Sequence, residues 1–167
     1  MFKFMRWLPH RAAKAAQPFF GTDREGQPPN TDVVIRQAAR TRLTAEPNQQ
    51  ISIPVSLHYS SADPLAVHID FPALVSSDGK EMTWSFARDL LENGLHRPSG
   101  IGDVHVWPYA HTHTMMEFRT PEGKAVAKFD TPVIQRFLLR SYVVVGRGSE
   151  DVGQALDRGL AALLDEV

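Results

Sequence analysis

The sequence predicts an α+β domain built around a strongly curved antiparallel sheet of about seven strands, with one short internal helix and two C-terminal helices. Two observations support this fold class. The middle of the chain alternates apolar and polar residues, as half-buried strands do, and turn residues separate the alternating segments at short intervals. After residue 30, helical periodicity is confined to one internal segment and the C-terminal end, and strands followed by helices indicate an α+β fold. The length, 167 residues, fits one ordinary domain.

The strands are predicted from their period of two. The first carries three arginines on one face and apolar residues on the other, so we expect a half-buried strand with a charged outer face. Pro, Gly, Asn and Asp residues between the alternating segments indicate turns. The predicted strands are Thr31–Leu43, Ile51–Tyr59, Leu65–Phe71, Met82–Phe86, Val104–Val106, Thr112–Arg119 and Lys124–Phe129.

The internal helix is expected at Ala87–Asn93, where Gly94 stops it. Its wheel places Leu90 and Leu91 on an apolar side, and Arg88 with its acidic neighbours on another. Three glycines in and after this segment are expected at positions of positive φ, which only glycine adopts freely. They are Gly94, Gly100 and Gly102.

The chain is expected to end in two helices. Thr131 is predicted to cap the first, with Pro132 at its first position, and two glycines after Val145 end it. Ser149 is predicted to cap the second. A narrow apolar stripe on that last helix is typical of a helix that packs on a neighbour; it consists of Val152, Leu156, Leu160 and Leu163.

Charge divides the chain into a basic arm, residues 1–30, and a domain, residues 31–167. Residues 1–42 hold eight Lys/Arg and three Asp/Glu, so the remaining residues hold 18 − 8 = 10 bases and 19 − 3 = 16 acids. The first 22 residues are basic and amphipathic, a pattern that contact with an anionic membrane surface would explain. A frayed tail, or a true start further along the chain, is the preferred interpretation. The acidic remainder would repel phosphates, so we expect no nucleic-acid partner.

The clearest enzymatic pattern is a histidine pair, His111 and His113, followed by Glu117. His-x-His on one strand face with a later Glu resembles the first metal motif of cupin barrels, and two imidazoles with a carboxylate suit Fe, Mn or Zn. His105 could supply a third imidazole. No histidine follows His113 to complete the second cupin motif, so a solvated strand face is the preferred interpretation.

Other catalytic chemistry is not indicated. The chain has no cysteine, which excludes thiolate nucleophiles and thiolate metal sites. No serine lies in a G-x-S-x-G turn, and the glycines around Ile101 lack the lysine of a phosphate-binding loop. We therefore expect no catalytic residue, no metal and no cofactor.

Two segments together carry a family resemblance. They are 61–71 (SADPLAVHIDF), preceded by Tyr59, and 84–108 (WSFARDLLENGLHRPSGIGDVHVWP). They resemble the SsgA-like proteins of sporulating actinomycetes, of the SsgA and SsgB type. The resemblance runs from about Arg40 to the C terminus and does not include the basic arm.

The resemblance implies a fold and a function. The fold would be similar to that of Whirly proteins, with a barrel-like sheet and C-terminal helices, assembled as a homotrimer. The function would be a non-enzymatic regulator of sporulation-specific cell division, an interaction module in septum-site selection. Its partners would be division proteins such as FtsZ and other SsgA-like proteins, and its place would be the cytoplasm at the division septum. A metal-dependent small-molecule enzyme using the histidine strand is the alternative.

Six residues of the second segment are candidates for partner contacts. The tryptophans are expected to anchor either a core or a binding patch. Arg88 and Asp89 could contact a partner, although fixing the helix against the next strand is the preferred role. Leu95 and Trp107 lie at element boundaries, where full burial is less assured. The set is Trp84, Arg88, Asp89, Leu91, Leu95 and Trp107.

Overall fold

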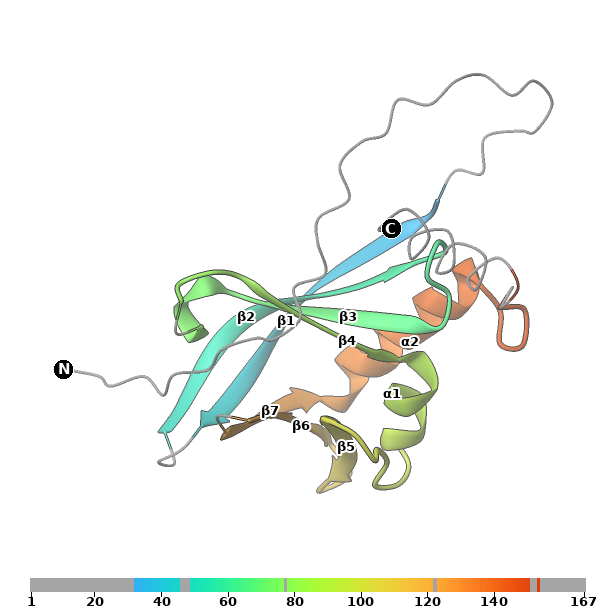
Figure 1. The fold of residues 1–167 in the computed structure, drawn as a ribbon. Coiled ribbons are helices and arrows are strands. Elements are labelled where there is room, and N and C mark those ends of the chain that lie inside the picture. Colours follow the sequence, from blue (N-terminus) through green and yellow to red (C-terminus); the bar gives the residue numbers. More distant parts are fainter. Residues whose placement is uncertain (1–31, 46–48, 77, 122, 151–152, 154–167) are drawn as a thin grey trace, which may run out of the picture.

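In the computed structural model, strands form one antiparallel sheet in the order β4-β3-β2-β1-β7-β6-β5 (Figure 1). The structure describes residues 32–45, 49–76, 78–121, 123–150 and 153. The seven strands within these ranges are β1 (Val34–Ala45), β2 (Gln49–Ser60), β3 (Ala66–Phe71), β4 (Met82–Ala87), β5 (Val104–Tyr109), β6 (His113–Thr120) and β7 (Gly123–Asp130). The predicted strands are therefore confirmed, with ends that differ by up to three residues.

Helices complete the fold. The α-helices are α1 (Arg88–Gly94) and α2 (Thr131–Val144). A short 3-10 turn between β3 and β4, Ala73–Val75, was not predicted from the sequence. The curled sheet brings α1 against both edge strands, β4 and β5, while α2 packs across β1, β2, β6 and β7 (Figure 1). No helix in the described ranges is long and apolar enough to cross a membrane.

The core lies on the inner face of the sheet. On β2 the odd-numbered residues from Ile53 to Tyr59 are buried, and the even-numbered ones face outward. Helix α2 closes the core with Ile134, Phe137 and Leu138. Burial of alternate residues on each strand is what the period of two predicts.

The start of α2 differs from the prediction. Thr131 is the first helical residue and Asp130 is the N-cap, without a side-chain cap hydrogen bond. Strand β7 continues to Asp130, and the Thr131 hydroxyl instead lies 3.0 Å from the hydroxyl of Thr114. The strand thus runs directly into the helix. The predicted last helix, with its apolar stripe, and the basic arm lie outside the described residues apart from Ser149, Glu150 and Gly153.

The internal helix also differs from the prediction. Arg88 was expected on the polar side but is only 1% exposed. Gly94 is inside α1 and has no positive φ, so it is not a stop signal of the expected kind. Of the three glycines, only Gly100 has a positive φ, +118°. Arg88 packs between two tyrosine rings, and Gly94 lies against Val106.

Candidate partner-binding site

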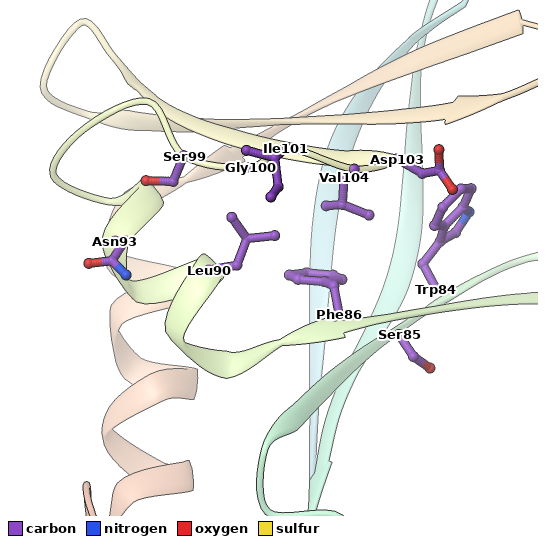
Figure 2. Close-up of a pocket in the computed structure, with 11 residues that line it drawn as sticks. Trp84, Ser85, Phe86, Leu90, Asn93, Ser99, Gly100, Ile101, Asp103 and Val104 are labelled. Atoms are coloured by element: carbon purple, nitrogen blue, oxygen red, sulfur yellow. The ribbon is translucent and has the colours of Figure 1, made fainter.

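A cleft of about 530 Å³ opens where the two edges of the curled sheet approach each other. Its walls come from β4, α1, the loop that follows α1, and the start of β5 (Figure 2). Most of the lining is apolar, with Asn93 and Asp103 at the margin. The lining residues are Trp84, Ser85, Phe86, Leu90, Asn93 and the run Ser99–Val104. All of them belong to the second segment that carried the family resemblance.

Aromatic packing beneath the cleft holds its β4 wall. The Trp84 ring lies 5.1 Å from that of Phe118 on β6, and the Phe86 ring lies 6.5 Å from it. Phe71 meets the same ring edge-on at 5.4 Å. Tilted and edge-to-face pairs of this kind add about 0.5–1.5 kcal/mol each beyond area burial. Phe118 therefore connects edge strand β4 to β6, the neighbour of the other edge strand, β5.

The loop on the other side is fixed at both ends. Ser99 exchanges two backbone hydrogen bonds with Val106, at 2.8 and 2.9 Å, and the Asp103 carbonyl accepts one from the Arg119 amide at 2.8 Å. A Cβ at Gly100 would lie 2.3 Å from the Val104 carbonyl oxygen, so only glycine fits. Between these fixed ends, Ile101 has a fully exposed side chain, at 106%. An exposed isoleucine on a fixed loop at the rim of an apolar cleft suits a protein contact.

Helix α1, which forms one wall, is held by Arg88. The guanidinium lies between two rings, with centroids 4.9 Å (Tyr59) and 4.2 Å (Tyr142) away. It donates to the carbonyls of Ser141, at 3.2 Å, and Val145, at 2.8 Å, at the end of α2, where a cation is favoured. Arg88 therefore ties the N-terminus of α1 to the C-terminus of α2.

Carboxylates complete this attachment. Glu150 accepts from the Arg88 guanidinium, and hydrogen bonds from its own backbone amide and from Arg88 lower its pKa. Glu92 of α1 accepts from the Tyr142 hydroxyl at 2.5 Å and pairs with Arg147. These contacts fix α1 to the last turn of α2 and to the residues that follow it.

The attachment also joins the two segments of the family resemblance. Tyr59, which precedes the first segment, places its ring on Arg88 of the second. Its hydroxyl donates to the Pro64 carbonyl at 3.0 Å, and the Arg88 amide donates to the Leu65 carbonyl at 2.8 Å. Burial raises the pKa of Tyr59 despite the opposing charge of Arg88. Both segments therefore support the same helix.

The candidate contact residues separate into three groups. Trp84 is half-buried in the cleft wall. Arg88 and Leu91 are buried, so in this structure neither side chain is on the surface. The others reach the surface elsewhere: Asp89 is exposed on α1, Leu95 is half-buried just after it, and Trp107 is half-buried on β5. Sequence reasoning missed Ile101, although an isoleucine between two glycines was a signal of an exposed loop tip.

The histidine motif is not assembled as a metal site. His111 lies in the turn between β5 and β6 at φ +59°, and not on the strand with His113. His113 lies 3.4 Å from Asp130, and Glu117 accepts from Arg119 at 2.5 Å. His105 lies 3.9 Å from Glu117. Across the part of the chain that the structure describes, no group of three His, Cys, Asp or Glu side chains could hold a metal ion.

A family model described as "Streptomyces sporulation and cell division protein, SsgA" matches residues 53–150. The chain belongs to the SsgA family. The cleft, Arg88 and Tyr59 all lie within the match, so the geometry above is that of an SsgA-family domain.

Relatives within the SsgA family are similar along most of their length. The sporulation-specific cell division protein SsgB of Salinispora tropica is 44% identical over 127 residues, which are 72% of this chain and 88% of that protein. The SsgB of Streptomyces coelicolor is 38% identical over 131 residues, 75% of this chain and 91% of that protein.

Solved structures of SsgA-family proteins share the fold. One, described with mutations in SsgB that correlate to longitudinal cell division during sporulation of Streptomyces coelicolor, has a TM-score of 0.63 at 34% identity and covers 71% of this chain and 94% of its own. The SsgA-like sporulation-specific cell division protein of Thermobifida fusca has a TM-score of 0.64 at 27% identity. The match covers 78% of this chain and 95% of that chain. The predicted α+β fold with a curled antiparallel sheet is confirmed.

Proposed function

We propose that this protein is a non-enzymatic interaction module of sporulation-specific cell division, and that the cleft between β4 and β5 receives apolar side chains of a division partner. The observation that carries the proposal is the pairing of an apolar cleft with a fully exposed Ile101 on a loop fixed at both ends. The names of the relatives support the process.

The partner and the place follow from the same proposal. A module of septum-site selection would bind a division protein such as FtsZ, or another SsgA-like protein, at the septum on the cytoplasmic side. The cleft offers a rigid apolar surface with a polar margin, and a few well-packed anchors usually carry most of the energy of an interface. We therefore expect binding to depend on Ile101 and Trp84 more than on surrounding charges.

The proposal is tested with Ile101→Asp, which changes a fully exposed side chain and should leave the fold unchanged. The matched control is Leu74→Asp, since Leu74 is 56% exposed in the 3-10 turn at the end of the β3–β4 hairpin away from α1. In a null strain, Ile101→Asp should fail to restore sporulation septa. In a pull-down from cell extract, the variant should no longer retain the division partner. Leu74→Asp should keep both.

Normal septation with Ile101→Asp would overturn the cleft as the contact site. The claim that the protein is not an enzyme has its own test, His111→Gln combined with His113→Gln. This variant should support septation, because glutamine nearly preserves the polarity of the two histidine positions and no catalytic imidazole is needed. If the histidine variant abolishes septation while Ile101→Asp does not, a metal-dependent activity becomes the better account.

A further inference from the structure

A row of side chains crosses the outer face of the sheet, opposite to α2. Arg42 of β1 lies opposite Lys128 of β7. Lys128 lies opposite Met115 of β6, which lies opposite Trp107 of β5. Directly opposite residues of antiparallel strands point to the same face. With about 4.8 Å between strands, the row is about 14 Å long and runs from an apolar end to a cationic end.

Within the part of the chain that the structure describes, the cationic end has no acidic partner. Among the described residues, no carboxylate forms a salt bridge with Arg40, Arg42 or Lys128. Arg40 reaches only the Ser52 hydroxyl, at 3.5 Å, and the Lys128 ammonium lies 5.8 Å from the centre of the Tyr109 ring. Three positive charges thus remain available on a chain whose formal net charge is −1.

Other basic side chains on this face are paired with an acidic side chain. Arg119 and Lys124, which are also directly opposite each other, share Glu117. Arg42 and Lys128 face each other without such an acid, and like charges directly opposite destabilise a sheet. The two charges repel each other and do not stabilise the folded state. An anion bound from solution would reduce this repulsion.

The other end of the row offers contacts to an apolar group. Tyr109 is 52% exposed on β5, and Trp107 and Met115 are half-buried beside it. Aromatic rings and methionine give adaptable apolar contact. Asp130, two residues from Lys128 on the same face, is already engaged by a histidine on β6. An acidic ligand with an apolar side chain would therefore match both ends.

We propose that this face of the sheet binds a short acidic peptide segment that carries apolar residues within about four residues of its carboxylates, the span set by the row. The surface consists of Trp107, Tyr109, Met115, Lys128, Arg40 and Arg42. The arginines present forks that match carboxylates bidentately, and the aromatic end receives the apolar residues. This surface is separate from the cleft and does not depend on the function proposed for it.

A peptide fits this surface better than a nucleic acid. Residues 31–167 hold 18 − 5 = 13 Lys/Arg against 19 − 2 = 17 Asp/Glu, a net charge of −4. A long polyanion would extend past the available cations onto an acidic surface and be repelled. A segment that covers only the row avoids this repulsion.

The experiment measures fluorescence anisotropy of a labelled Leu-Leu-Ser-Asp-Asp peptide with the full chain. The comparison peptide, Leu-Leu-Ser-Asn-Asn, has the same shape without the two side-chain charges, and both peptides are amidated at the C terminus. Single-stranded DNA and phosphatidylserine vesicles test the other anions. Arg42→Gln combined with Lys128→Gln should weaken binding of the acidic peptide about tenfold or more. The matched control, Lys80→Gln with Arg97→Gln, removes the same charge from exposed positions elsewhere and should bind normally.

Each outcome decides the proposal once circular dichroism has shown that both variants fold. A loss confined to the Arg42/Lys128 variant and to the acidic peptide supports it. Equal binding of the amide peptide, equal weakening by both double variants, or tighter binding of DNA or vesicles through Arg42 and Lys128 overturns it. The septation phenotype of Ile101→Asp is a separate readout, so the two proposals fail independently.

Discussion

At the scale of single residues, Arg88 shows how burial can reverse an interpretation from sequence. An arginine beside Asp89 in a helix is normally a solvated residue, yet here its charge lies between two tyrosine rings and two helix-end carbonyls. A buried charge is tolerated only when it is paired and hydrogen-bonded, and Arg88 is both. Its role is to hold the wall of the cleft.

Replacing Arg88 by Met should destabilise the protein. The change preserves length and apolar contact but leaves the α2 carbonyls and Glu150 without their donor. Removing one partner of a buried charge network costs about 3–5 kcal/mol, and the lower end applies because Glu150 can turn towards water. Urea unfolding measures the loss, with Asp89→Asn as the exposed neighbouring control. Coincident curves for Arg88→Met and the wild type would contradict this role.

His58 makes stability depend on pH. Burial lowers its pKa from 6.5, despite the attraction of Asp70 at 3.0 Å; the nearby His68 and Arg36 lower it further. The unfolded chain then binds the proton more readily than the folded one. The stability that this group contributes is therefore present above pH 6.5 and is lost as the pH falls from 6.5 towards the folded pKa.

His58→Gln should reduce that pH dependence. Between about pH 7.5 and about pH 5.5, the free energy of unfolding should fall less in the variant than in the wild type. Urea unfolding at both pH values measures the difference. Each curve is compared with that of the wild type at the same pH and ionic strength. A steeper loss in His58→Gln would show that the sign is wrong.

At the scale of elements, α1 lies directly against β5 because Gly94 has no side chain. A Cβ there would lie 2.3 Å from Val106 Cγ1 and 2.4 Å from its Cβ. The close contact places Leu90 and Asn93 opposite the loop that ends at Val104, and so sets the width of the cleft (Figure 2).

Gly94→Ala should therefore destabilise the protein. Alanine gains about 1 kcal/mol in helix propensity, but overpacking against Val106 costs about 1–3 kcal/mol and forces the helix away from the strand. Gly102→Ala is the control, because a Cβ there meets nothing within 4 Å and its φ is not positive. It should change the free energy of unfolding by less than about 0.5 kcal/mol. Equal stability of the two variants would show that α1 can shift without cost.

At the scale of the whole molecule, the two surfaces proposed to bind other molecules lie on different parts of one sheet. The cleft lies where the edges approach each other, and the cationic row crosses the outer face. We further propose that copies of the chain associate as a trimer through the apolar stripe after Gly148, as the family resemblance implies.

A truncation tests this assembly, and the structure decides where to cut. Removal of everything after Gly148 would also remove Glu150, the partner of Arg88, and so would confuse folding with assembly. A chain that ends after Glu150 keeps that contact but loses the stripe, and it should sediment as a smaller species than the full chain. A full-length protein that is monomeric at micromolar concentration would overturn the trimer.

Much of the fold could be predicted because a half-buried strand exposes its period of two in the sequence. The odd-numbered residues of β2 and the arginines on the outer face of β1 lie where alternation places them. The N-cap of α2 was wrong by one residue, since the Thr131 hydroxyl can cap a helix or pair with another side chain, and its pairing with Thr114 depends on a distant strand.

By itself, the sequence determined the class of fold, the family and the two segments that carry the family resemblance, because periodicity, turn residues and motif spacing are local properties of the chain. Only the tertiary structure decided that Arg88 and Leu91 are buried, that His111 is separated from the strand of His113, and that Ile101 stands exposed at the rim. The reason is physical: burial, charge pairing and close approach depend on residues that are distant along the chain, and curling the sheet brings those residues together.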